Sequence, residues 1–134
     1  MKIVAAECSS PTATPELVEE LFADDQKRGE FMILEKDKYD FIQVGGETAA
    51  DGFTLEYRER GKDGKLYHCP RTVSRNEAEA AFLDYLDGNE GWKSRFAWEE
   101  SEGGGFSNRI AGLVLAAVAI AAIAAYAISR IAAL

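Results

Sequence analysis

The sequence predicts an α+β domain, a small antiparallel sheet with two helices on one face, followed by a single C-terminal transmembrane helix. Two helix signatures begin at Thr14 and at Ser74, and four short strand-like segments lie between them. Near the C-terminus, positions 110–128 contain no charged residue. The strands adjoin one another in sequence and the helices flank them, which is typical of a mixed domain with an antiparallel sheet.

Three parts of the chain follow from these observations. We expect residues 1–100 to form an acidic soluble domain, 101–109 a glycine-rich linker, and 110–134 the membrane anchor with a short tail. The linker contains Gly103-Gly104-Gly105, and chain of this composition is flexible. A domain of about 100 residues can bury one hydrophobic core without disulfide or metal support.

The first helix is predicted to begin at Thr14-Pro15. Threonine is a good N-cap, and proline is favoured at the first helical position. The apolar stripe that follows at helical spacing consists of Leu17, Val18, Leu21 and Phe22. Gly29 is expected to end this helix as its C-terminal cap.

Two strands are predicted next, over 31–34 and 39–44. The first is a continuous apolar run, which is typical of a buried strand. The polar turn Lys36-Asp37-Lys38 separates the two strands, and Gly45-Gly46 ends the second.

A hairpin is predicted over 53–69. Positions 53–58 alternate between apolar and polar residues, which turns every second side chain toward the core. The core set is Phe53, Leu55 and Tyr57, and the set expected to face solvent is Thr54, Glu56 and Arg58. Gly61-Lys62-Asp63-Gly64 is a turn sequence, and 66–69 returns as the next strand until Pro70.

The second helix is predicted from a capping box, in which Ser74 is the N-cap and Glu77 the reciprocal partner. Gly88 is expected to end it. The side chains that this helix should bury are Ala78, Ala81, Phe82, Tyr85 and Leu86. The aromatic closing segment, Trp92 to Trp98, is expected to be a short turn and then a strand.

The soluble part is strongly acidic. Before Ile110 the chain has 14 basic and 23 acidic residues, a net charge of −9. Nucleic-acid-binding proteins usually carry a basic patch, and the sequence shows no basic cluster, so a nucleic-acid partner is not expected. Anionic lipid headgroups should also repel this domain, so its membrane attachment must come from the apolar segment.

The two cysteines, Cys8 and Cys69, are expected to be reduced thiols. The first ten residues, MKIVAAECSS, lack the apolar stretch of an export signal. Disulfides form in oxidising compartments, and without an export signal the domain should remain in the cytoplasm. The same missing stretch argues against Cys8 as a lipoprotein cysteine.

The segment IAGLVLAAVAIAAIAAYAI, residues 110–128, is predicted to span a membrane. A helix of this length covers about 28 Å, close to the hydrocarbon thickness of a bilayer. A soluble helix this long would show a polar face, and this one has none. Its Ile, Val and Leu residues give an insertion energy of about −2 to −5 kcal/mol, a weak but sufficient anchor.

Residues near the segment set its orientation. Arg109 and Arg130 bracket it, and Tyr126 is placed as an interfacial aromatic. Lys93, Arg95 and Arg109 precede it closely, whereas one basic residue, Arg130, follows it. The positive-inside rule therefore predicts a tail-anchored, single-pass protein of the inner (cytoplasmic) membrane with its N-terminal domain in the cytoplasm.

Small residues line one face of the predicted span. They are Ala117, Ala121, Ala125 and Ser129, with Gly112 and Ala116 as a similar pair. Small residues at this spacing let membrane helices approach closely, which predicts helix packing and a homo-oligomer in the membrane. An alanine-rich span also produces such rows through its composition alone, and this alternative stays open.

Catalytic and cofactor motifs are absent from the sequence. It has no P-loop, no GxSxG elbow, no HExxH and no paired CxxC, so no catalytic residue, cofactor or metal site is assigned. His68 and Cys69 are a suggestive pair, but adjacent residues on a strand point to opposite faces, and catalysis requires them to meet. A zinc site built from Cys8, His68 and Cys69 lacks a fourth ligand.

The candidate interaction surface combines aromatic residues of the closing segment with polar residues of one strand. Its members are Trp92, Phe96, Trp98, Glu56 and Arg58. Exposed aromatic side chains with an acidic rim suit protein interfaces, and an acidic face attracts a basic partner. The alternative interpretations are closure of the core for the aromatic residues and a solvated surface for the carboxylates.

The stretch GFTLEYRERGKDGKLYHCPRTVSRNEAEAAFLDYLDGNEGWKSRFAWEE resembles the Imm1-type immunity proteins in outline. The shared features are a GFTLEY-like strand, a hairpin, a capped helix and a closing W-(x)3-F-x-W-E. Such immunity proteins neutralise toxins by binding them, so the resemblance implies a binder rather than an enzyme. The membrane tail departs from their usual soluble form.

These observations predict a non-enzymatic protein-interaction module held at the membrane, with an unidentified protein partner. A flexible tether raises the effective concentration of such a module near membrane partners. The alternative is a small membrane-tethered hydrolase that uses surface carboxylates. A concave cleft with converging carboxylates of raised pKa would favour that alternative.

Overall fold

The computed structural model describes residues 1–46 and 52–101. The predicted transmembrane helix, its row of small residues and the predicted linker beyond residue 101 lie outside the described residues. Within the described ranges, no helix combines the length and the apolarity that crossing a bilayer requires.

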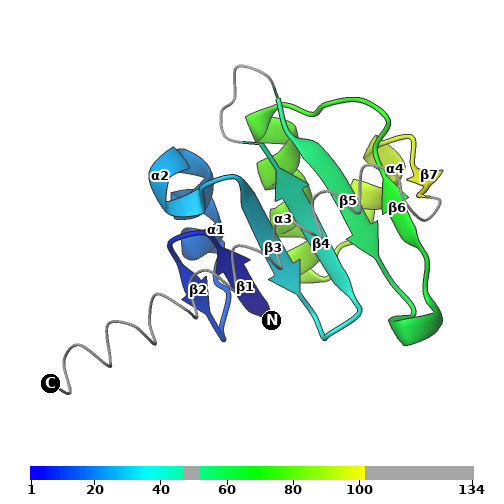
Figure 1. Ribbon diagram of the computed structural model, residues 1–134, viewed down its shortest axis with the longest axis horizontal. Coiled ribbons are helices and arrows are strands. Elements are labelled where there is room, and N and C mark those ends of the chain that lie inside the picture. Colours follow the sequence, from blue (N-terminus) through cyan, green and yellow to red (C-terminus); the bar gives the residue numbers. More distant parts are fainter. Residues whose placement is uncertain (47–51, 102–134) are drawn as a thin grey trace, which may run out of the picture. The chain divides into compact units, whose positions relative to one another are not determined.

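Antiparallel strands in the described residues form one sheet, in the order β2-β1-β3-β4-β5-β6-β7 (Figure 1). The bounds are β1 Lys2–Ala5, β2 Ser9–Ser10, β3 Phe31–Glu35, β4 Phe41–Gly45, β5 Thr54–Arg58, β6 Leu66–His68 and β7 Glu99–Glu100. Every neighbouring pair in this order is antiparallel, which confirms the predicted α+β class with an antiparallel sheet.

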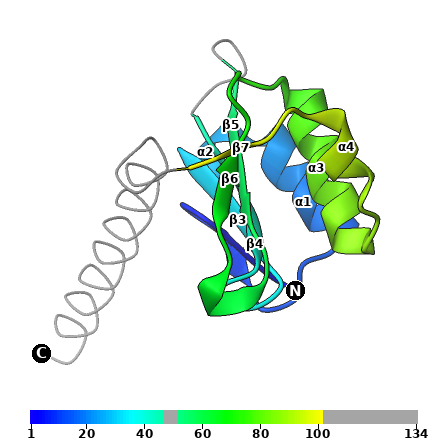
Figure 2. The same cartoon turned by 90° about the vertical axis from the view of Figure 1, so that its right-hand side faces the viewer.

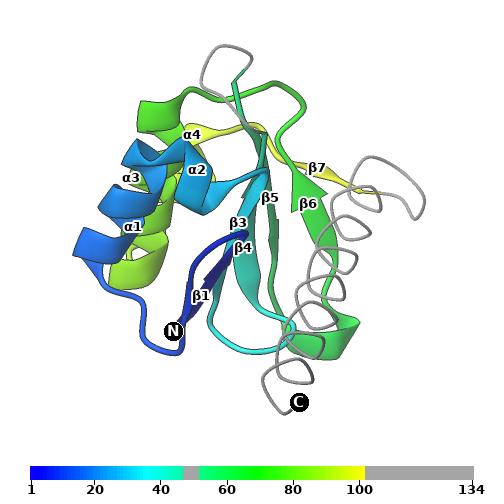
Figure 3. The ribbon, with the colours of Figure 1, turned by 60° about the vertical axis from the view of Figure 1, so that its left-hand side comes forward.

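The helices form a second layer on one face of the sheet (Figures 2 and 3). They are α1 Pro15–Ala23, α2 Asp25–Arg28, α3 Arg75–Asp87 and α4 Gly91–Arg95, with a 3₁₀ turn η1 at Gly61–Asp63. The two longer helices, α1 and α3, lie side by side in this layer, as the sequence predicts, and the short helix α4 extends it.

The hydrophobic core lies between the helices and the sheet. The strands contribute Ile3, Met32, Leu34, Ile42, Val44 and Leu55, and the helices contribute Val18, Leu21, Phe22, Ala78, Ala81 and Phe82. The Phe22 ring contacts Phe53 and Phe82 edge to face, with ring centres 6.0 and 5.2 Å away. Edge-to-face pairs match the negative ring face of one aromatic with the positive edge of the next, so this trio joins both layers.

Helix α3 begins as the capping box predicts. The Ser74 hydroxyl accepts a hydrogen bond from the Glu77 amide at 3.2 Å, and the Glu77 carboxylate accepts one from the Ser74 amide at 3.1 Å. Gly88 ends the helix in a left-handed conformation with φ 79°. Leu86, which was expected to be buried, is only partly so.

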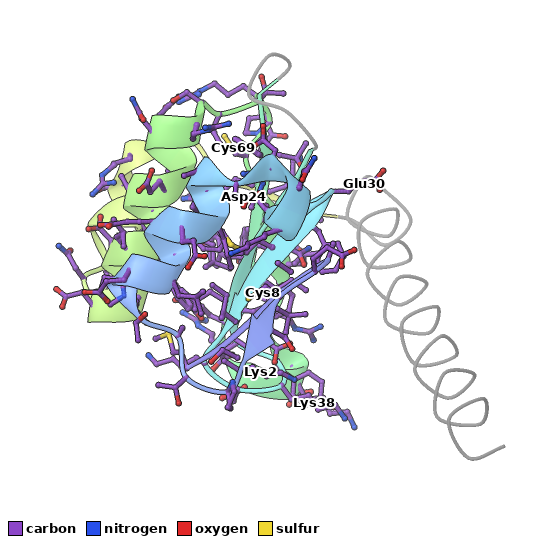
Figure 4. The ribbon with its side chains drawn as sticks, turned by 90° about the vertical axis from the view of Figure 1, so that its left-hand side faces the viewer. Lys2, Cys8, Asp24, Glu30, Lys38 and Cys69 are labelled. Atoms are coloured by element: carbon purple, nitrogen blue, oxygen red, sulfur yellow. The ribbon has the colours of Figure 1, made fainter. Side chains whose placement is uncertain are left out.

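The first predicted helix is two helices. Asp24 adopts an extended conformation between α1 and α2, and its carboxylate accepts hydrogen bonds from the amides of Gln26 and Lys27, both at 3.1 Å (Figure 4). An aspartate N-cap competes with helix continuation, because its side chain satisfies the free amides of a new first turn. Gly29 therefore caps α2 and not α1.

Three strand predictions differ from the structure. Strands β1 and β2 were not predicted, although Ile3 and Ala5 alternate into the core in the manner of a strand. Strand β4 begins at Phe41, two residues later than expected. The closing segment contains helix α4 where a turn was expected, and its strand, β7, begins only after Trp98.

Candidate functional site

The structure divides the five residues of the predicted interaction surface between two faces of the sheet. On the helix-covered side, Trp92 and Trp98 pack against the ring of Tyr57, and Phe96 packs against Trp98. Glu56 and Arg58 alternate with Tyr57 along β5, so they belong to the opposite face. The five residues therefore do not form one continuous patch.

The aromatic residues close one end of the core. The Tyr57 ring centre lies 4.8 Å from that of Trp92 and 4.7 Å from that of Trp98, and the two indoles are 5.8 Å apart. The Trp98 indole donates a hydrogen bond to the Lys93 carbonyl at 3.0 Å. Trp92 is 2% exposed and Phe96 8%, so the interpretation as core closure holds for these two, and Trp98 is partly exposed.

Glu56 is not at a solvated surface, contrary to the expectation from its strand pattern. It is fully buried, and Phe31 and Ile33 on the same face of the sheet are only 6% and 7% exposed. Alternation along a strand determines which face a side chain occupies, but not whether that face meets solvent. The exposure of Glu56 was therefore predicted wrongly, although its face was predicted correctly.

A row of polar residues crosses four strands on the face opposite the helices. In the register of the sheet, Gln43 of β4 lies beside Glu56 of β5, Glu56 beside His68 of β6, and His68 beside Glu99 of β7. We call this set the polar row. Residues directly opposite one another in neighbouring antiparallel strands have adjacent side chains. Four groups from distant parts of the sequence are thus brought into one line.

The central carboxyl group of the polar row is only partly satisfied. The Gln43 amide donates a hydrogen bond to Glu56 Oε2 at 2.7 Å. The second oxygen, Oε1, has no hydrogen-bond partner among the described residues. Burial raises the pKa of Glu56, and the Gln43 hydrogen bond opposes that rise by favouring the charged form.

The outer part of the polar row is held by His68. Its Nδ1 lies 2.7 Å from the Ser101 hydroxyl, and its Nε2 lies 3.7 Å from a Glu99 carboxylate oxygen. The His68 side chain is 28% exposed and that of Glu99 64%. This end of the row is therefore accessible, and it offers a hydroxyl, an imidazole and a carboxylate to a binding partner.

The side chains of His68 and Cys69 lie on opposite faces of the sheet, as the sequence predicts. Cys69 belongs to the core cluster, whereas His68 belongs to the opposite face, so the two side chains do not form a pair. Cys8 and Cys69 are free thiols on separate segments (Figure 4). Within residues 1–46 and 52–101, no three His, Cys, Asp or Glu side chains converge as a metal site.

A second row of residues runs parallel to the polar row on the same face. Phe41, Arg58 and Leu66 face one another across β4, β5 and β6, and all three are partly exposed. Arg58 donates a hydrogen bond to the Lys62 carbonyl at 2.6 Å, and its guanidinium lies 5.5 Å from the Tyr39 ring centre. We call this set the mixed row. Its central arginine is held between two apolar side chains.

We expect replacement of Glu56 with glutamine to change how stability depends on pH. Because the folded-state pKa of Glu56 lies above the ordinary value of 4.5, the folded chain holds the proton more tightly than the unfolded chain. Ionisation of Glu56 thus destabilises the fold progressively as pH rises above about 4.5. Glu56→Gln, which keeps an acceptor for Gln43, should gain stability relative to wild type over that range.

Urea unfolding at a series of pH values measures this difference. The free energies of unfolding of the two proteins should differ least below the pKa of glutamate in the unfolded chain, where both proteins carry a neutral side chain at this position. Glu99→Gln is the matched control, since Glu99 is exposed in the same row. A difference between Glu56→Gln and wild type that stays constant across the pH series would contradict the raised pKa.

Comparison of the chain with protein-family models, with curated proteins and with solved structures finds no match.

Proposed function

We propose that this chain is a membrane-anchored, non-enzymatic protein-interaction module that faces the cytoplasm and binds its partner through the mixed row and the accessible end of the polar row. The observation that carries this proposal is the composition of that sheet face. Arg58 lies between Phe41 and Leu66, and the accessible end of the polar row, His68 and Glu99, lies beside them. Protein interfaces favour such a centre of arginine and aromatic residues with a polar rim.

The geometry of Arg58 supports a role at the centre of an interface. Its hydrogen bond to Lys62 and its contact with the Tyr39 ring hold the guanidinium in place before a partner arrives. A side chain that is ordered in advance loses less conformational entropy on binding. The Nε atom of Arg58 is buried and has no hydrogen-bond partner among the described residues.

The charge of the domain favours a basic protein partner. The net charge of −9 before Ile110 attracts a positively charged protein over distances set by the ionic strength. Such attraction raises the association rate more than it raises affinity. The rate of association should therefore fall as salt is added.

The membrane part of the proposal rests on the sequence of residues 110–128, which is charge-free and long enough for one span. The basic residues before it favour a cytoplasmic domain. Gly112, Ala116, Ala117, Ala121, Ala125 and Ser129 would be the helix-packing residues of a homo-oligomer. The Imm1-like outline of residues 52–100 also favours a binder, one that neutralises a toxin protein.

A site-specific crosslinking experiment tests the binding face. A photo-reactive phenylalanine analogue at Leu66, in the full chain expressed in cells, should give a discrete protein adduct. The same analogue at Asn76, an exposed position on α3, is the control and should not give that adduct. Arg58→Ala should abolish the Leu66 adduct, and Arg58→Lys should restore it only in part, since lysine lacks the planar fork.

The result that overturns the binding face is an adduct of equal yield at both positions, or one that Arg58→Ala leaves unchanged. The anchor is tested separately by removing residues 110–134. The truncated chain should leave the membrane fraction and keep its tryptophan fluorescence. Retention in the membrane fraction would contradict the anchor without affecting the binding face.

The hydrolase alternative is favoured by one observation, the raised pKa of Glu56 beside His68. A carboxyl group that stays protonated can act as a general acid. Among the described residues, however, no second carboxylate lies within hydrogen-bonding distance of Glu56. Hydrolysis of model substrates that disappears in Glu56→Gln, with the fold retained, would support the enzyme instead of the binder.

A further inference from the structure

A hollow of about 430 Å³ lies where the β5–β6 hairpin approaches α4, and neither row of the proposed binding face lines it. Its volume is within the range of about 300–1,000 Å³ that is usual for small-molecule sites. One wall consists of the rings of Tyr57 and Tyr67, which are stacked with centres 5.2 Å apart and planes 17° apart. Tyr57 is buried and Tyr67 is partly exposed, so the aromatic surface that a ligand can reach is the ring of Tyr67, with the ring of Tyr57 behind it.

Tyr57 stays neutral. Burial raises the pKa of Tyr57, with a smaller rise from the nearby carboxylate of Glu59, so the phenol keeps its proton at neutral pH. A neutral phenol ring presents a negative π face and a hydroxyl donor. Both suit a ligand that has a ring and a polar group.

Most of the charged groups in the hollow are already paired. The Lys93 ammonium lies 2.8 Å from a Glu59 oxygen and 3.4 Å from a Glu90 oxygen. The Lys65 ammonium lies 3.1 Å from a Glu100 oxygen. These lysines therefore have anionic partners within the chain, and a ligand would have to displace those partners to use them.

Two other charged side chains that line the hollow have no such partner in the described part of the chain. Among the described residues, neither Arg60 nor Asp63 has a side-chain hydrogen bond or an ion pair with another residue. Both are exposed, and they lie at the two ends of the turn η1. The hollow thus presents one unpaired cation and one unpaired anion beside an aromatic wall.

The backbone fixes the distance between these two residues. Arg60 adopts the left-handed conformation with φ 72°, which is uncommon for a residue with a side chain. Gly64 closes the turn, and a Cβ there would lie 1.7 Å from the Glu59 carbonyl oxygen, so no other residue fits. The turn is held tightly, and it keeps Arg60 and Asp63 on the rim of the same hollow.

We propose that this hollow binds a free aromatic α-amino acid as its zwitterion. The ligand carboxylate pairs with the Arg60 guanidinium, which suits carboxylates because it can donate two parallel hydrogen bonds. The ligand ammonium pairs with Asp63, and the ligand ring packs against Tyr67. A simple anion or cation would leave one of the two rim charges without a partner. This site is separate from the proposed protein-binding face.

Isothermal titration of the full chain in detergent tests this proposal with three matched compounds. Phenylalanine carries both charges, phenethylamine lacks the carboxylate, and 3-phenylpropionate lacks the ammonium. Phenylalanine should bind about tenfold or more tightly than either of the others, because each lost ion pair removes a charge-assisted contact. Equal binding of the three compounds, or no heat from phenylalanine at millimolar concentration, overturns the proposal.

Variants of the turn test the assigned roles. Arg60→Gly keeps the left-handed backbone, because glycine favours positive φ, and should remove the preference for phenylalanine over phenethylamine. Asp63→Asn should remove the preference over 3-phenylpropionate. Lys62→Gln, in the same turn but not lining the hollow, is the control and should bind as wild type. If Arg60→Gly and Asp63→Asn retain both preferences, the assignment is wrong. Crosslinking at Leu66 is independent of all these outcomes.

Discussion

Replacement of Phe82 with alanine is expected to lower the free energy of unfolding by about 3–5 kcal/mol. The Phe82 side chain is fully buried, and its ring meets Phe22 edge to face at 5.2 Å. Phe22 in turn contacts Phe53, so the three rings join α3, α1 and the sheet. Truncation to alanine leaves a cavity at this junction, and the neighbouring rings can close it only in part.

Urea unfolding followed by tryptophan fluorescence measures this loss, since Trp92 and Trp98 lie in the same domain. Leu83→Ala is the matched control, because Leu83 is the next residue of α3 and is only partly buried. Ser74→Ala should cost about 1 kcal/mol through loss of the N-cap. If Phe82→Ala and wild type have the same midpoint, the core-facing side of α3 has been identified wrongly.

Elements with a local sequence signature were predicted well. The Ser74–Glu77 capping box and Gly88 fix both ends of α3, because capping involves residues within one turn of each other. Thr14 and Pro15 fix the start of α1 in the same manner. The buried strand β3 and the alternating strand β5 were recognised from single-strand patterns.

Elements that depend on distant pairing were missed. Strands β2 and β7 contain two residues each and exist because β1 and β6 pair with them. Strands this short carry no periodicity, so the sequence alone cannot identify them. The break at Asp24 was also missed. The apolar stripe of α1 ends before Asp24, and the polar residues that follow are compatible with one continuous helix or with two.

The candidate site was predicted only in part, because the pairing register of the strands decides which side chains lie next to one another. Glu56 and Arg58 were selected from β5, but the neighbours that define their rows, such as Gln43 and Phe41, are set by the pairing of β4 with β5. Register depends on turn geometry and on contacts across the sheet. Trp92 and Phe96 are of residue types that are common both in protein interfaces and in cores, and the structure places them in the core. Residue type alone cannot separate these two roles.

Arg28→Ala is expected to be about as damaging as the loss of Phe82, at about 3–5 kcal/mol. Arg28 is fully buried, and its guanidinium donates hydrogen bonds to the carbonyls of Leu21 and Phe22 at 3.1 and 3.0 Å. These carbonyls belong to the last turn of α1, where helical partners are missing and the helix dipole is negative. The same guanidinium pairs with Asp25 and lies 4.9 Å from the Phe53 ring centre.

The effect of Arg28→Ala should also depend on pH. The hydrogen bond from Arg28 is the largest cause of the lowered pKa of Asp25, so the contribution of Asp25 to stability is present above the ordinary value of 3.8 and is lost as pH falls below it. The difference in free energy of unfolding between Arg28→Ala and wild type should therefore become smaller in acid. It should not vanish, because in the variant the α1 carbonyls lack the Arg28 donors at every pH.

Lys27→Ala separates the role of burial from the role of charge at this position. Lys27 is adjacent to Arg28 and pairs with Glu20 at 2.6 Å, but both side chains of that pair are about half exposed. Exposed ion pairs contribute little to stability, because water screens them and ordering the side chains costs entropy. The urea midpoints of the two variants at neutral pH show which of the two side chains contributes more to stability. A loss in Arg28→Ala no larger than that in Lys27→Ala would mean that the buried guanidinium does not hold α1, α2 and the sheet together.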